Sequence, residues 1–159
     1  MTERVYVAVC GAGEPTAEEA AWAEEIGRAV ARAGAVLVCG GLGGVMDAAA
    51  RGAESAGGTS IGILPGADRG AASSHLTVAI ATGLGEARNA LVVRAADVLI
   101  AVGGEFGTLS EIALALKTGV PVVGLGTWEL SKRGAPVRAI VQAANPEEAV
   151  AVALGLTPR

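Results

Sequence analysis

The stretch ADVLIAVGGEFGTLSEIALAL, residues 96–116, decides the fold because it joins an apolar strand to a helix through a glycine-rich turn. Residues 98–102 form an unbroken apolar run, which is typical of a strand buried on both faces of a parallel sheet. Similar runs alternate with helix-like segments along most of the chain. This alternation predicts an α/β fold.

The expected architecture is a three-layer, doubly wound, Rossmann-like sheet, mostly parallel, with about seven strands and helices on both faces. Strands are expected at residues 4–10, 35–39, 59–64, 76–81, 97–102, 121–125 and 139–142. Helices are expected after the glycines of the quoted stretch and at residues 17–33, 45–56, 85–96 and 146–154. Loops are expected at residues 67–75 and 127–136. The length favours a single domain over residues 1–159.

The charge of the chain bears on its partners. A net charge of −4 without a basic block gives no electrostatic sign of nucleic-acid binding or of attraction to an anionic membrane. No apolar run approaches the ~20 residues that span a bilayer, and the N-terminus lacks the features of a signal peptide. We therefore expect a cytoplasmic protein without nucleic-acid or membrane partners.

Cys10 and Cys39 each end an apolar run. Neither belongs to a CxxC pair or to a cluster with histidines, which are the patterns that bind metals. We expect two buried free thiols and no metal site.

Glycine-rich loops follow several expected strands. In doubly wound sheets, ligands bind beyond the carboxyl ends of the strands, near the point where the strand order reverses. This rule points to loops 11–16, 40–46, 82–88 and 103–108. Residues 40–49, GGLGGVMDAA, place four glycines before a helix whose N-terminal N–H groups favour a phosphate. The same glycines also fit a turn that has no ligand, and the pattern leaves both interpretations open.

Residues 108–111, TLSE, also have two interpretations. They match a capping box, in which the Glu111 side chain reaches back to the N–H of the capping Thr108. Alternatively, Thr108 binds a phosphate and Glu111 is the acid of a binding site.

Arg88 lies near the start of an expected helix, where a positive charge does not complement the helix dipole. An anionic ligand beside Arg88 would explain this position. A surface ion pair with Glu86 or Asp97 would explain it equally well.

Three motifs carry a resemblance to a known family: GGLGGVM, an Arg about ten residues before an Asp-led strand, and GGEFGTLSE. Together they resemble the LOG-like family, which is often labelled lysine decarboxylase-like or Rossmann-fold nucleotide-binding, over roughly residues 4–155. LOG-type members carry PGGxGTxxE with an essential Glu and MHxRK with an essential Arg. The resemblance therefore implies catalytic roles for Glu111 and Arg88 if the chain is an enzyme.

The resemblance also implies a phosphate- or ligand-binding set, which consists of Gly11, Gly41, Gly43, Gly44, Met46, Gly103, Gly104, Gly107 and Thr108. Two signature residues differ, because Gly103 replaces the Pro and Glu105 replaces a Gly. Only the Arg of MHxRK remains. These differences bring the chain closer to a branch that resembles molybdenum cofactor carrier proteins, which bind a phosphate-bearing pterin and need no chemistry.

The first expected function is therefore binding of a phosphate-bearing nucleotide or a molybdopterin-type pterin, with no tightly bound cofactor. The second is a phosphoribohydrolase that cleaves the N-glycosidic bond of nucleoside 5′-monophosphates. The third is an assembly module whose glycines only form turns. Lysine decarboxylation fits poorly, since Lys117 and Lys132 are the only lysines. The resemblance implies a homodimer or homotetramer.

Overall fold

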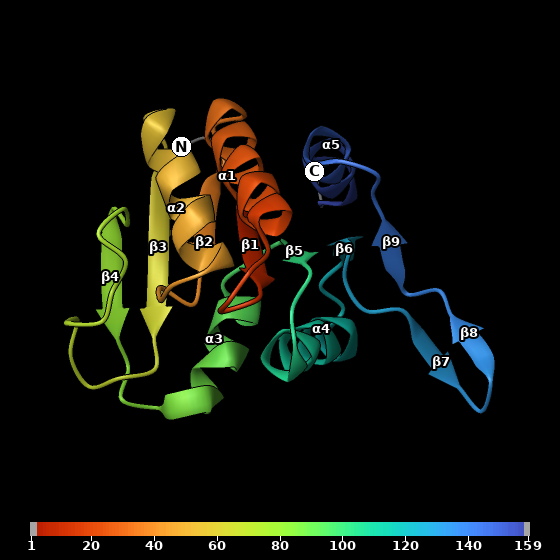
Figure 1. Cartoon of the computed structure of the whole chain (residues 1–159). Coiled ribbons are helices and arrows are strands. Elements are labelled where there is room, and N and C mark those ends of the chain that lie inside the picture. Colours follow the sequence, from red (N-terminus) through yellow and green to blue (C-terminus); the bar gives the residue numbers. More distant parts are fainter. Residues whose placement is uncertain (1–2, 158–159) are drawn as a thin grey trace.

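The computed structural model describes residues 3–157 and contains a seven-stranded parallel sheet with helices on both faces (Figure 1). The order of the strands is β4-β3-β2-β1-β5-β6-β9. Every neighbouring pair in this sheet is parallel. The strands are β1 (Tyr6–Gly11), β2 (Val36–Cys39), β3 (Thr59–Leu64), β4 (Val78–Ala81), β5 (Val98–Val102), β6 (Val122–Leu125) and β9 (Ile140–Gln142). The predicted doubly wound α/β fold is confirmed.

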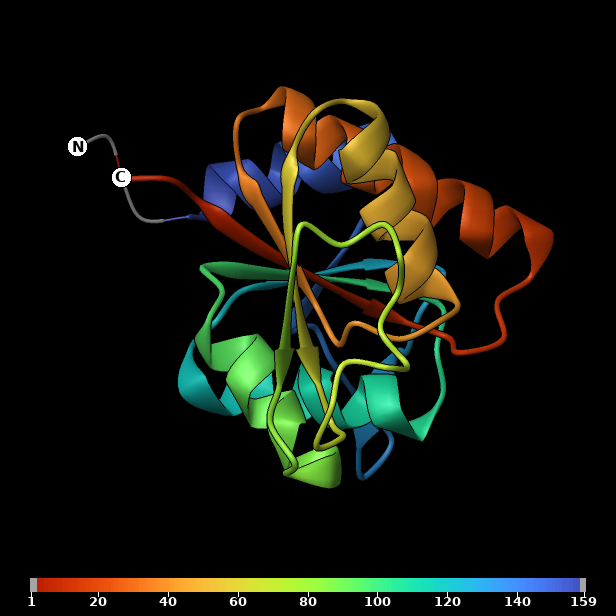
Figure 2. The same cartoon turned by 90° about the vertical axis from the view of Figure 1, so that its left-hand side faces the viewer.

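Two helical layers enclose the sheet (Figure 2). One layer contains α1 (Ala17–Arg32), α2 (Val45–Ser55) and α5 (Pro146–Leu156), which pack on Val7, Val9 and Leu37. The other contains the 3₁₀ turn η1 (Gly85–Arg88), α3 (Asn89–Arg94) and α4 (Phe106–Thr118). Helices α3 and α4 pack on Ala8 and Val38. Because side chains alternate along a strand, each continuously apolar strand supplies both cores.

The two helices that carry the clearest start signals are capped by their own side chains. Thr16 accepts a hydrogen bond from the Glu19 N–H at the start of α1, and the Glu19 carboxylate accepts one from the Thr16 N–H. Asn145 accepts a hydrogen bond from the Glu148 N–H at the start of α5, with Pro146 in the first helical turn. Both caps agree with the sequence, since Thr and Asn favour the N-cap and Pro favours the first helical position.

The prediction of a loop at residues 127–136 is partly wrong. It contains β7 (Leu130–Lys132) and the start of β8 (Ala135–Val137), which form an antiparallel hairpin outside the main sheet (Figure 1). Arg133 and Gly134 both have positive φ, as the two central residues of a type I′ hairpin turn require. Strands of three residues carry too little alternation to be recognised in the sequence.

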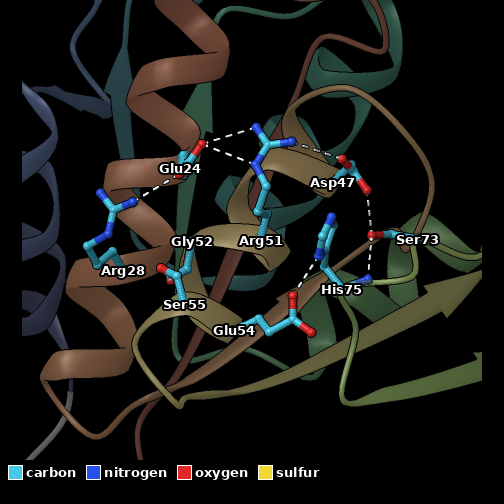
Figure 3. A network of polar contacts seen from close by, with 9 residues as sticks. All are labelled: Glu24, Arg28, Asp47, Arg51, Gly52, Glu54, Ser55, Ser73 and His75. Carbon is cyan, nitrogen blue, oxygen red and sulfur yellow. Dashed lines mark hydrogen bonds and ion pairs between the residues drawn. The ribbon is translucent and has the colours of Figure 1, made fainter.

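A loop, rather than a helix, joins β3 to β4. Ser73 holds this loop, because its hydroxyl donates to Asp47 Oδ1 at 2.6 Å and its N–H donates to Gly41 O at 2.9 Å. His75 Nδ1 lies 2.6 Å from Glu54 Oε2. Figure 3 shows the Ser73–Asp47 and His75–Glu54 contacts beside ion pairs that link Glu24, Arg28, Arg51 and Asp47 across α1 and α2. The loop is thus attached both to α2 and to the glycine-rich turn before it.

Within residues 3–157, the helices are either too short or too polar to span a bilayer. The same part of the chain contains no cluster of three or more His, Cys, Asp or Glu side chains that could bind a metal ion.

Candidate functional site

The candidate site lies where the strand order of the sheet reverses. From β1 the chain builds β2, β3 and β4 on one side and then continues with β5 on the other side of β1. The loops that leave the carboxyl ends of β1 and β5 therefore diverge, and doubly wound folds bind their ligands at such a place. The glycine-rich turns predicted from the sequence all lie along this edge.

Helix α4 begins earlier than the capping-box interpretation requires. Its N-cap is Glu105, which makes no side-chain hydrogen bond to the helix. The first intrahelical bond runs from Leu109 N to Glu105 O, so the N–H groups of Phe106, Gly107 and Thr108 precede the helical ladder. The predicted capping box of Thr108 and Glu111 is wrong, because both residues lie inside the helix. Their side chains are buried.

The glycines before α4 are required by their own neighbours. Gly103 and Gly104 have φ values of +53° and +98°, which side-chain-bearing residues rarely adopt. A Cβ at Gly103 would collide with the Glu19 carboxylate, and one at Gly104 would collide with the Thr108 hydroxyl. Gly107 differs, since nothing lies within 4 Å of the position of its Cβ. Gly107 is therefore the glycine of this turn that faces open space.

The turn before α2 shows the same division. Gly41 packs against Leu64, and Gly44 packs against the backbone of residues 12 and 13. Gly11, at the end of β1, packs against Val45 and the Val102 carbonyl. Gly43 has no neighbour within 4 Å of a Cβ and is exposed. Helix α2 has Gly44 as its N-cap, so no side chain caps it. The Val45 N–H of α2 already donates to the Ala12 carbonyl at 3.0 Å, so the N-terminus of α2 is less open to an anion than that of α4.

Arg88 is buried, with 8% of its surface exposed, although it carries a permanent charge. Its Nη1 donates to Asn89 Oδ1, and its Nη2 lies 2.8 Å from the place where a Cβ of Gly40 would stand. Its Nε is buried and has no hydrogen-bond partner among residues 3–157. The surface pair with Glu86 or Asp97 is therefore wrong, and Asp97 instead accepts a hydrogen bond from the Tyr6 N–H.

A chain of hydrogen bonds links Arg88 to the turn before α4. Asn89 Nδ2 donates to Ser110 Oγ at 3.0 Å, and Ser110 Oγ donates to the Gly107 carbonyl at 2.7 Å. Because Arg88 donates to the amide oxygen of Asn89, the amide of Asn89 connects the guanidinium to the first turn of α4. The buried cation and the open glycine therefore belong to one polar network.

Glu111 is buried beside this network, with 7% of its surface exposed. Burial raises the pKa of its carboxyl from 4.5 to about 7, although the charge of Arg88 and hydrogen bonding with the Cys10 thiol both act to lower it. Burial and the neighbouring Glu111 also raise the pKa of Cys10. Glu111 thus changes its charge near neutral pH, which suits a group that exchanges protons.

The structure also brings in residues that sequence reasoning missed. Gly40 makes room for Arg88 and for the sulfur of Met46. Trp128 donates from Nε1 to the Glu105 carbonyl at 3.3 Å, and its ring lies 5.7 Å from that of Phe106, centre to centre. Nothing local in the sequence relates Trp128 to the turn, whereas Gly40 was visible as the first glycine of its loop. Both predicted buried free thiols, Cys10 and Cys39, are found as such.

A hollow of about 470 Å³ adjoins Trp128, and none of the site residues predicted from the sequence lines it. It lies between the hairpin and the end of the sheet, and Trp128 is one of its walls. Its lining residues are Trp128, Glu129, Leu130, Pro136, Val137, Arg138, Ile140 and Gln142. The candidate site is thus polar around Arg88 and Glu111, and Trp128 contacts both the turn before α4 and this separate hollow.

The fold and the site define a doubly wound α/β protein whose candidate site lies at the switch point of its sheet. The chain belongs to the SLOG cluster 4 family, whose family model matches residues 4–150. An uncharacterized protein of Archaeoglobus fulgidus is 46% identical over 121 residues, which cover 76% of this chain and 80% of that protein.

Two solved structures are similar to this chain over nearly all of its residues. The molybdenum cofactor binding protein of Rippkaea orientalis is 34% identical with a TM-score of 0.88, and the match covers 98% of this chain and 99% of that one. The molybdenum cofactor carrier protein of Chlamydomonas reinhardtii is 36% identical with a TM-score of 0.85, covering 97% of this chain and 98% of that one. The resemblance to the carrier branch of the LOG-like family is confirmed.

Proposed function

We propose that the protein binds a small phosphate-bearing ligand, a nucleotide or a molybdopterin-type pterin, at the switch point of its sheet. The observation that carries the proposal is Arg88, a buried cation whose Nε lacks a hydrogen-bond partner within residues 3–157. A buried charge with an unsatisfied donor is costly, and an anionic ligand beside the guanidinium would offset that cost. The similarity to molybdenum cofactor carrier proteins supports a pterin of this type.

The phosphate has a specific place in this proposal. The N–H groups at the start of α4 are uncapped, whereas α1 and α5 are capped by Thr16 and Asn145. Gly107 and Gly43 are the two glycines of the predicted set that face open space. We assign the phosphate to the N-terminus of α4 beside Gly107, and Gly43 leaves room beside the N-terminus of α2.

The remaining predicted residues have supporting roles in this proposal. Gly11, Gly41, Gly44, Gly103 and Gly104 allow the turns to pack, since a Cβ at each would meet protein atoms. Thr108 lies against Gly104, and Met46 lies against Gly40 beside the Arg88 guanidinium. These residues shape the crevice, and Arg88 supplies its positive charge.

A second function, hydrolysis of nucleoside 5′-monophosphates, is favoured by one observation. Glu111 has a pKa raised to about 7 and lies near the Arg88 charge, so it can take up or release a proton at neutral pH. In a phosphoribohydrolase, Glu111 would activate water or stabilise the positive charge that develops on the sugar. The carrier function requires no such step.

The experiment that separates these functions combines binding and turnover. AMP, GMP and a pterin phosphate are added to the wild-type protein and to Glu111→Gln, and free base, ribose 5-phosphate and melting temperature are measured. The carrier function predicts higher melting temperatures without base release, in both proteins. If wild type releases free base and Glu111→Gln does not, the protein is instead a hydrolase. No stabilisation by any phosphate ester would contradict both.

We also propose that the chain forms a homodimer or homotetramer in the cytoplasm. Val78 and Ile80 of the edge strand β4 are 44% and 47% exposed, and exposed apolar side chains on an unpaired edge favour association. Light scattering after size exclusion tests this proposal. A monomer at micromolar concentration would contradict it.

A further inference from the structure

Phe106 is the most exposed of the large hydrophobic side chains that are exposed within residues 3–157, at 76%. The chain has only one Phe, one Tyr and two Trp. Phe106 is the first residue of α4, next to Gly107 and to the uncapped N–H groups of the helix. An aromatic ring is therefore held in solvent at the place to which the phosphate is assigned.

Trp128 contacts both the Phe106 ring and the turn before α4. Its ring is tilted by 36° to that of Phe106, at a centroid distance of 5.7 Å. Its Nε1 donates to the Glu105 carbonyl, and the preceding Thr127 donates to the Gly103 carbonyl at 2.5 Å. The two rings thus have a defined position relative to the glycine-rich turn.

The hollow next to Trp128 offers polar groups as well as apolar walls. Glu129, Arg138 and Gln142 line it together with Leu130 and Ile140. A carboxylate, a guanidinium and an amide are complementary to the ring N–H groups, ring nitrogens and carbonyls of a heterocycle. Trp128 belongs both to this hollow and to the pair with Phe106, so the hollow and the turn share a wall.

We propose that Phe106 and Trp128 bind the planar heteroaromatic ring of the ligand, and that they determine its preference for a pterin or nucleobase over a simple sugar phosphate. This inference rests on the proposed function, because it assigns the ring of a ligand whose phosphate lies at α4. Aromatic side chains stack on heteroaromatic rings with little dependence on the pattern of ring substituents. Phe106 and Trp128 thereby supply ring binding, and the polar groups of the hollow supply selectivity among rings.

The test compares ligands that share a phosphate and differ in the ring. The dissociation constants of AMP, GMP, a pterin phosphate and ribose 5-phosphate are measured by calorimetry on wild type, Phe106→Ala and Leu156→Ala. Leu156 is the control because it is also an exposed apolar side chain, at 40%, and is the last residue of α5. The inference predicts that wild type and Leu156→Ala bind at least one ring-bearing ligand about tenfold more tightly than ribose 5-phosphate. Phe106→Ala should lose most of that difference while binding ribose 5-phosphate within about twofold of wild type.

Fluorescence gives a readout that does not depend on the Phe106 substitution. In a Trp22→Phe background, Trp128 is the remaining tryptophan. A stacked ring should quench its emission on addition of the ring-bearing ligand, and ribose 5-phosphate should leave it unchanged. Absence of quenching at saturation would overturn the inference.

Two outcomes distinguish failure of this inference from failure of the proposed function. If ribose 5-phosphate binds wild type and a ring adds no affinity, or if Phe106→Ala changes only the oligomeric mass, the aromatic pair is not a ring site, and the phosphate site stands. If no phosphate ester binds, the proposed function fails and the ring assignment fails with it.

Discussion

The Arg88 guanidinium lies against the backbone of Gly40, with Nη2 2.8 Å from the place where a Cβ at that glycine would stand. The sulfur of Met46 lies 2.7 Å from the same place. A methyl group at Gly40 would therefore push both side chains aside. The first glycine of the turn after β2 thus makes room for the one buried arginine found in residues 3–157.

Gly40→Ala should displace Arg88 while leaving the fold intact. The colliding atoms all belong to two long, flexible side chains, so we expect the free energy of unfolding to fall by only about 1 to 2 kcal/mol. The affinity for AMP or a pterin phosphate should fall severalfold. Calorimetric titration alongside denaturation in urea measures the two effects, and unchanged affinity would show that the Gly40 contact does not position Arg88 for binding.

The raised pKa of Glu111 predicts how stability depends on pH. Between pH 4.5 and about 7 the folded protein keeps a proton that the unfolded chain has released. The unfolded state therefore binds fewer protons in this range, and the contribution of Glu111 to stability falls by about 3 kcal/mol as the pH rises through it. Above about pH 7 both states are ionised and the contribution no longer changes.

Glu111→Gln removes this term. The difference in unfolding free energy between the variant and wild type should increasingly favour the variant from pH 5 to 7 and level off by about pH 8. Urea denaturation at several pH values measures the difference directly, and other titrating groups cancel in it. Parallel curves for the two proteins would mean that the pKa of Glu111 is not raised.

Two glycines of one turn should respond in opposite directions. Gly104→Ala places a Cβ at φ +98° and against Thr108, so it should destabilise the protein by about 2 kcal/mol or more. Gly107→Ala lies in the first turn of α4 in open space, so it should be neutral or stabilise by up to about 1 kcal/mol. Thermal denaturation measures both effects.

Binding should distinguish the two glycines as well. In Gly107→Ala the new methyl group occupies the space assigned to the phosphate, so ligand affinity should fall although the protein is as stable as wild type. A stable Gly107→Ala protein with full affinity would place the phosphate elsewhere.

Ser73 offers a test of the loop between β3 and β4. Ser73→Ala removes the 2.6 Å hydrogen bond to Asp47 that holds this loop near Gly41, and should lower stability by about 1 kcal/mol and ligand affinity a few fold. Ser55→Ala is the control, since Ser55 Oγ donates within its own helix to Gly52 O at 2.7 Å (Figure 3). Equal effects of the two substitutions on affinity would show that the loop between β3 and β4 does not contribute to ligand binding.

The sheet was predictable because its strands are apolar on both faces and are separated by helices with local start signals. Thr16 and Asn145 are such signals, and both cap their helices. The TLSE pattern at residues 108–111 failed for a local reason. Two glycines with positive φ let the chain enter α4 at Phe106, so Thr108 and Glu111 fall inside the helix and become buried.

Other parts of the site depend on contacts that are distant in the sequence. The burial of Arg88 results from the packing of η1 against the turn after β2, and no local pattern records it. Trp128 reaches Phe106 only because the segment after β6 folds back over the turn before α4. The family signature identified Arg88 and Glu111, whereas the residues around them required the three-dimensional arrangement.

The most direct test of the central claim is the affinity of a phosphate ester for Arg88→Met. Methionine keeps much of the length and the apolar stem of arginine but removes the buried charge and the unsatisfied donor. It also removes the cation beside Glu111 and the donor to Asn89 Oδ1, so the stability of the variant is measured in parallel by denaturation in urea. We predict that wild type binds AMP or a pterin phosphate measurably and that Arg88→Met binds it at least about tenfold more weakly, since a charged hydrogen bond of about 1.5 to 3 kcal/mol is lost. Equal affinity of the two proteins would contradict the account.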